Sequence, residues 1–307
     1  MVQNFVSVLI FQLLAAASSL VAAQYLQLSE LVSDTTFEVA GSIQAVDVEF
    51  KQWDLLLDAK SPHYARRSVR VCVRSGDFAI YPLGAKVQGQ LQAKGDAFLL
   101  SAVWPNDANA QGIVHSVNHQ LRMDTTARGH YPFRAIGEYL PAFALYNQRG
   151  LVTQSSNLQG GYVVMNFIFT RCMVARMCPL STQKMRTLAG LLSEASDLPV
   201  RLLSVTLDPD YDTPGVFEEY ARAYEFPAGS IDFLTGPEPA VRDLKAQLGV
   251  LAKADDKLII NHTMMVIVAD PLGKISYQVP GSAWSPEAVF EHIKQQHAAA
   301  QDAKADS

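Results

Sequence analysis

Two cysteines with five residues between them, Cys172 and Cys178, are the side chains of this sequence best suited to chemistry. A thiol pair can form a structural disulfide, bind a soft metal ion or exchange disulfides with another protein. In an exported protein the structural disulfide is the commonest of these outcomes. The spacing of the two thiols leaves all three possibilities open.

The flanking sequence predicts the elements that position these thiols. The apolar run at residues 163–169 predicts a buried strand that ends just before Cys172. Pro179 suits the first turn of a helix, and apolar residues then recur at helical spacing. Both thiols therefore lie on a loop between the end of a strand and the start of a helix, which is where open α/β sheets place their sites.

Charged residues near the thiols predict how they ionise. A helix N-terminus lowers the pKa of a nearby thiol, and Arg171 and Arg176 would lower it further or bind an acidic partner. Met173 and Met177 lie inside the cysteine loop, where a thioether is either a weak metal contact or a packing group. We expect loop packing for both methionines.

Other donors lie at the ends of later strands. His262 precedes a strand predicted at 263–269, a place where a single histidine is usually structural. Asp208 and Asp210 follow a strand predicted at 200–207, where they could orient His262, bind a hard cation or serve the turn.

Four motifs in the second half of the chain resemble those of the Sco/SenC family. They are NFIFTRC-x5-CP, SVTLDPDYDTPG, FLTGPE and NHTMMVIVADPLGK, in family order over residues 140–294. Members are copper-binding, thioredoxin-like proteins linked to cytochrome c oxidase assembly. The resemblance implies Cys172, Cys178 and His262 as Cu(I) ligands, with Cu(II) as the second oxidation state, and Asp208 as a side chain that supports His262. The commoner family spacing places three residues between the cysteines, and this chain has five.

Two functions follow from these residues. One is a copper metallochaperone that passes Cu(I) to a cytochrome c oxidase subunit or another copper protein. The alternative is a thiol–disulfide oxidoreductase of the cell envelope, with Cys172 and Cys178 as its catalytic pair. A redox enzyme has no need of His262, and redox motifs usually keep the thiols closer, as in Cys-x-x-Cys. Both points favour copper.

Composition and the N-terminus set the class of protein. The 307 residues suggest about two domains, and 49% hydrophobic with 18% charged residues supports a packed core. A net charge of −5 gives no basic surface for nucleic acid. Residues 1–23 predict a signal peptide, although Lys51 is the first basic residue. An uncleaved leader that attaches the protein to the membrane is the alternative, and either outcome places the chain in the periplasm or cell envelope.

The fold prediction is α/β, with a thioredoxin-like domain at 138–297 preceded by a small β-rich domain, a barrel or a sandwich, at 36–105. Residues 106–137 are expected to be a linker, and 298–307 a disordered tail. The linker holds His115, His119, Met123 and His130, for which we favour an ordinary helical face over copper loading.

The third cysteine, Cys72, lies in the β-rich domain. In the segment VRVCVR the valines share one face of a strand, and Cys72 shares the other with Arg70 and Arg74. A thiol beside two cations can be reactive, and we expect a quiet, partly covered cysteine.

Overall fold

The computed structural model describes residues 25–26, 35–59, 61, 66–195, 197–254 and 260–305, with the backbone alone at 252–254, 260–262 and 304–305. These residues form two units, which divide the chain after Asp107. Within the described ranges no helix is both long enough and apolar enough to cross a membrane. The leader predicted at 1–23 lies outside the described residues.

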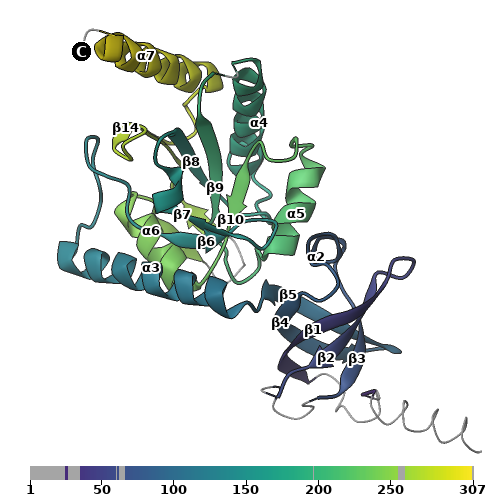
Figure 1. Ribbon diagram of the computed structural model, residues 1–307. Coiled ribbons are helices and arrows are strands. Elements are labelled where there is room, and N and C mark those ends of the chain that lie inside the picture. The colour runs from purple at the N-terminus through teal and green to yellow at the C-terminus, as the bar shows by residue number, and fades with distance from the viewer. Residues whose placement is uncertain are drawn as a thin grey trace, which may run out of the picture. The chain divides into compact units, whose positions relative to one another are not determined.

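The first unit is a closed β-barrel of five strands, drawn in purple and blue in Figure 1. Its elements are β1 (Thr36–Asp47), β2 (Gln52–Leu57), β3 (Ser68–Cys72), α2 (Ser75–Ile80), β4 (Lys86–Lys94) and β5 (Ala97–Pro105). The strand order is β1-β2-β3-β5-β4, and β1 closes the barrel because it pairs with both β2 and β4. This order, with a parallel β3–β5 pair, is that of an OB-fold. The β-rich fold is thereby confirmed as a barrel.

Strand β3 shows the predicted alternation. Val69 and Val71 are fully buried in the barrel core, while Arg70 is exposed and Cys72 is half-buried on the outer face. Arg70 donates two hydrogen bonds to Asp54, at 2.7 and 2.9 Å. The Arg70 charge is therefore matched by a carboxylate rather than directed at the neighbouring thiol. The Cys72 sulfur accepts a 3.4 Å hydrogen bond from the Gln52 amide.

The second unit is α/β. Its elements are α3 (Ala108–Arg128), β6 (Ala144–Tyr146), β7 (Val152–Gln154), η2 (Ser155–Leu158), β8 (Tyr162–Ile168), α4 (Cys178–Glu194), β9 (Val200–Thr206), α5 (Pro214–Ala223), β10 (Asp232–Leu234), α6 (Glu238–Gln247), β11 (Ala252–Ala254), β12 (Ile260–His262), β13 (Met265–Ala269), β14 (Ile275–Pro280) and α7 (Pro286–Ala305). The central sheet has the order β10-β9-β8-β13-β14.

The pairing in this sheet is thioredoxin-like. Strands β8, β9 and β10 are parallel and are joined through α4 and α5, whereas β13 and β14 form an antiparallel hairpin beside β8. Helix α7 then packs against α4, and α3 packs against α6 (Figure 1). A β-α-β unit followed by a hairpin and a helix confirms the predicted fold class.

The core explains why these segments form these elements. Every residue of β8 is buried, which is typical of a central strand covered on both faces. Helix α6 buries Val241 and Leu244, and the chain leaves it through Gly249 at a φ of 72°. Thr213 stands at the N-cap of α5 as expected, although its side chain makes no capping hydrogen bond.

Helix α3 occupies most of the segment expected to be a linker, residues 106–137. It buries Val114 and Leu121 in the second unit, and the Asn118 amide bonds to both the carbonyl oxygen (2.7 Å) and the N–H (3.1 Å) of Ala144. The segment is thus a structural helix of the second unit. Its docking depends largely on polar contacts, which a search for apolar stripes does not reveal.

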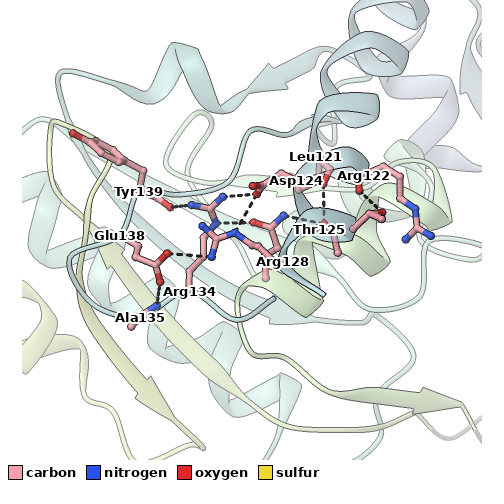
Figure 2. A network of polar contacts seen from close by, with 11 residues as sticks. Leu121, Arg122, Asp124, Thr125, Arg128, Arg134, Ala135, Glu138 and Tyr139 are labelled. Atoms are coloured by element: carbon pink, nitrogen blue, oxygen red, sulfur yellow. Dashed lines mark hydrogen bonds and ion pairs between the residues drawn. The ribbon is translucent and has the colours of Figure 1, made fainter. Parts of the chain in front are cut away.

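A polar network centred on Arg134 holds α3 in place (Figure 2). The nearly buried Arg134 guanidinium bonds to Asp124 of α3 at 2.6 Å, to Gln247 of α6 at 2.6 Å and to the Tyr139 carbonyl at 2.8 Å. Gln247 in turn donates to the Thr125 hydroxyl at 2.8 Å. Helix α3, the following loop and α6 are therefore tied together by one cation.

The C-terminal segment also differs from expectation. Residues 298–307 were expected to be disordered, and α7 instead continues to Ala305. This stretch, AAAQDAKA, is rich in alanine, which has the highest intrinsic helix propensity. The Tyr162 ring contacts His297 at the point where the prediction ended the helix, with ring centroids 6.1 Å apart.

Candidate metal centre

The cysteine loop begins where β8 ends. Phe169 is buried, and its carbonyl accepts a 3.3 Å hydrogen bond from the Cys172 backbone N–H. After the loop, Cys178 is the first residue of α4 and Pro179 lies in the first turn. The strand–loop–helix placement of both thiols is therefore the one that the sequence predicted.

A buried polar network fixes the first turn of α4 against the sheet. Asn166, in the middle of β8, donates to the Ser181 hydroxyl of α4 at 2.8 Å. Its oxygen accepts a 2.5 Å hydrogen bond from Ser204 of β9. Sequence reasoning missed Asn166 because it counted the residue within an apolar strand. These bonds position the helix turn that carries Cys178.

The two thiols lie together and are both buried. Cys172 is 8% exposed and Cys178 is 0% exposed, and neither forms a disulfide. Their side chains hydrogen-bond to each other, and the Phe169 backbone also bonds to Cys178. The loop thus closes on itself and brings the two sulfurs to one place at the end of β8.

The predicted direction of the thiol pKa was wrong for Cys178. Burial raises the pKa of Cys178 above its ordinary value, and the neighbouring Cys172 raises it further, while the Phe169 backbone opposes the rise. A helix dipole and nearby cations produce a net lowering of a thiol pKa only when their effect is larger than that of desolvation. The burial of Cys178 therefore determines that its pKa is raised rather than lowered.

Arg171 is paired with a carboxylate rather than with a thiol. Its Nε and Nη2 donate to Asp208 at 3.0 and 2.6 Å, and its guanidinium lies 4.2 Å from the centre of the Tyr211 ring. This ion pair fastens the cysteine loop to the end of β9. Asp208 was predicted to support His262, and the described contact of its carboxylate is to Arg171. Arg176 is exposed.

Asp212 is a further carboxylate of the site that sequence reasoning did not select. It is 0% exposed, and it accepts hydrogen bonds from the Thr170 N–H at 3.3 Å, the Thr206 hydroxyl at 2.7 Å and the Thr170 hydroxyl. Burial raises the pKa of Asp212 to about 7 against the effect of these bonds, and Asp208 adds to the rise. Nothing in the string DPDYDTPG distinguishes Asp212 from the exposed Asp210.

The two loop methionines differ. Met177 packs against the core, as expected, whereas Met173 is 92% exposed and has no packing role. Tyr220 of α5 lies close enough to Cys178 to interact with it electrostatically, and its hydroxyl is 2.8 Å from the Thr182 hydroxyl of α4. Burial raises the pKa of Tyr220, so its hydroxyl stays protonated.

The third predicted ligand, His262, is described by its backbone alone. It ends β12 and pairs with Ala252 of β11. The predicted role of its side chain lies outside the described residues. The side chains that are described contain no group of three or more histidine, cysteine, aspartate or glutamate residues that could hold a metal ion.

Comparisons with known proteins assign the second unit. A family model described as SCO1/SenC matches residues 135–298, just over half of the chain. The SCO1 protein homolog of Bacillus subtilis (strain 168) is 30% identical over 139 residues, which are 43% of this chain and 69% of that protein.

Solved structures of Sco proteins are also similar. ScoI of Bradyrhizobium japonicum with copper bound has a TM-score of 0.44 at 22% identity, over 52% of this chain and 99% of that one. BsSco is described as a member of the Sco family of cytochrome c oxidase assembly proteins with a disulfide switch. It has a TM-score of 0.45 at 22% identity, over 53% of this chain and 95% of that one.

Proposed function

Since this chain belongs to the SCO1/SenC family, we propose that it is a metallochaperone that binds Cu(I) and delivers it during cytochrome c oxidase assembly. The observation that carries the proposal is the pair of buried thiols, Cys172 and Cys178, which hydrogen-bond to each other at the end of β8. The His262 imidazole is the third ligand in this proposal.

The donor set suits monovalent copper. Thiolate sulfur is a soft ligand that favours Cu(I), and imidazole accepts copper in either oxidation state. Burial excludes water and oxidants from the sulfurs. Because metal binds the thiolate, copper must displace the proton that burial holds on Cys178. Copper affinity is therefore expected to fall as the pH is lowered.

The receiving partner is a cytochrome c oxidase subunit or another copper protein. The exposed part of the cysteine loop is the surface such a partner meets first. Met173 and Val174 are both exposed there, and Arg176 adds a positive charge. An acidic partner with an apolar contact would match this loop.

We place the protein in the periplasm or cell envelope. The motivation is the apolar leader at residues 1–23. Intact mass of the protein purified from the cell envelope tests this. Cleavage near Ala23 is expected, and a retained leader would favour attachment to the membrane through the N-terminus.

A thiol–disulfide oxidoreductase is the second candidate, because the two thiols are adjacent. In that reaction they would give two electrons and two protons to a partner disulfide, and would themselves form a disulfide. The burial of both sulfurs and the raised pKa of Cys178 oppose rapid attack on a partner. Copper binding therefore takes precedence.

Anaerobic Cu(I) titration of the reduced protein tests the proposal. One tightly bound Cu(I) is expected, with two sulfurs and one nitrogen near copper by X-ray absorption. Cys172→Ala or Cys178→Ala should abolish tight binding because one thiolate remains. His262→Ala should weaken binding less, because both thiolates remain.

Cys72→Ala is the matched control, since it removes a thiol from the barrel and should leave Cu(I) affinity unchanged. If Cys178→Ala binds Cu(I) as tightly as the wild type, the metallochaperone proposal fails. Loss of disulfide reduction in the same variant would then favour the oxidoreductase.

A further inference from the structure

Helix α3 has one side fixed against the second unit. Val114, Leu121 and Thr125 are buried on that side, and Asn118 bonds to the backbone of β6. Figure 2 shows the polar contacts that fasten this side. The rotation of the helix about its axis is therefore set, and so is the side that faces water.

Three metal-binding side chains follow one another on the exposed side. His115, His119 and Met123 are all exposed and are spaced by four residues. Residues four apart on a helix are neighbours, with Cβ atoms about 5–6 Å from each other. Two histidines at this spacing can bind one metal ion together, as in the zinc motif His-Glu-x-x-His.

In the part of the chain that the structure describes, no hydrogen bond or ion pair engages the His115 or His119 side chain, so both imidazoles are available as donors. The nearest charged residues of the helix point elsewhere, because Arg122 pairs with Asp243 at 2.9 Å and Asp124 pairs with Arg134 at 2.6 Å. A metal cation would therefore meet no unmatched positive charge from Arg122.

The histidines of α7 provide a contrast. His292 lies 3.2 Å from the Ser276 hydroxyl and contacts the Tyr277 ring, and His297 lies 2.9 Å from the Gln301 amide. They are five residues apart, so they do not share a face as residues four apart do. Among the described histidines, two exposed ones spaced four residues apart on a helix occur in α3 alone.

We propose that His115, His119 and Met123 form a second copper site on the exposed side of α3. The two imidazoles bind Cu(II), and the Met123 thioether adds a soft donor that helps to hold Cu(I). This site is separate in sequence from the cysteine loop, and the proposal does not depend on copper binding there. Its exposure suits capture and release of copper rather than permanent retention.

Cu(II) titration of the full, untagged chain with Cys72, Cys172 and Cys178 replaced by serine tests the proposal, since no thiol can then bind or reduce the metal. One Cu(II) is expected, with nitrogen ligands visible by electron paramagnetic resonance. Met123→Leu should leave Cu(II) affinity within about twofold and weaken Cu(I) binding about tenfold, because thioethers prefer Cu(I).

The decisive control moves one imidazole around the helix. The double variant His119→Gln/Gln120→His keeps the histidine count and should bind Cu(II) at least about tenfold more weakly, because chelation is lost. Cu(II) affinity equal to that of the parent would overturn the proposal. If the serine variant does not fold, the site is tested instead by the retention of the wild-type chain on a Cu(II)-chelating resin. The His119→Gln/Gln120→His chain must elute earlier, and equal elution would refute the site.

Discussion

Replacement of Asp212 by asparagine tests whether one buried carboxyl makes the second unit sensitive to pH. The Asp212 side chain is 0% exposed and holds Thr170, the residue at which the cysteine loop begins. Asparagine has the same shape and can keep hydrogen bonds to both threonines, and it does not titrate. The variant therefore isolates the charge.

The expected sign follows from the pKa of the folded state. Burial raises the pKa of Asp212 from 3.8 to about 7, so the folded chain holds this proton more tightly than the unfolded chain. The stabilisation by this proton is fully present below the unfolded pKa and is lost as the pH rises through the folded pKa. One pKa unit is worth about 1.4 kcal/mol, so the whole effect is about 4 kcal/mol. About 2.5 kcal/mol of it is lost between about pH 5 and about pH 8.

Urea unfolding of the reduced chain, followed by far-UV circular dichroism, measures the effect. The signal reports mainly on the second unit, which contains the long helices α3 to α7. Subtraction of the wild-type free energy of unfolding from that of Asp212→Asn cancels the other titrating groups. The difference should rise by about 2–3 kcal/mol in favour of the variant from about pH 5 to about pH 8.

Asp210→Asn is the matched control, because Asp210 is exposed and lies two residues away. Because this side chain is not buried, its replacement should not produce the rise of about 2–3 kcal/mol that is expected for Asp212→Asn. A pH-independent difference for Asp212→Asn would show that the carboxyl ionises normally in the folded protein and that burial does not raise its pKa.

Two further predictions concern the packing around the site. Asn166→Leu leaves two buried serine hydroxyls without their partner, so it should lower the free energy of unfolding by about 1–3 kcal/mol and speed the reaction of Cys178 with a thiol reagent. Asn166→Asp, measured in parallel, keeps the shape of the side chain and the acceptor for Ser204 but loses the N–H donor to Ser181. It therefore distinguishes the loss of a hydrogen bond from a change in side-chain shape. A fragment of residues 108–305 should unfold at higher urea than one of residues 140–305, because the shorter one lacks α3 and Arg134 and leaves the Gln247 side chain without these partners. Equal midpoints would mean that α3 contributes nothing to stability.

The elements that sequence alone predicted well are those whose signal is local. Two such signals are the apolar run that forms β8 and Pro179 at the start of α4. Each can be recognised from a few consecutive residues, because burial and helix initiation restrict the residue types there. The same holds for the hairpin of β13 and β14. These elements bring the two cysteines together, so the thiol pair was predictable.

What sequence did not predict depends on contacts between distant segments. Asn166 bonds to Ser181, 15 positions away, and Asp212 bonds to Thr170, 42 positions away. Helix α3 docks through Asn118 and Arg122, so its buried stripe is too polar to identify. The pKa of Cys178 depends on how much water the folded chain excludes, which is a property of the whole unit.

Cys172 and Cys178 are each held by a secondary-structure element, so the loop between them can change in length without moving either thiol. Cys172 is held at the end of β8 through Phe169, and Cys178 is the first residue of α4. Between them, residues 173–176 are exposed. Insertions and deletions during evolution can fall there without disturbing either anchor. The five-residue spacing of this chain and the three-residue spacing common in the family then differ in the surface offered to a partner, while the sulfurs keep their place.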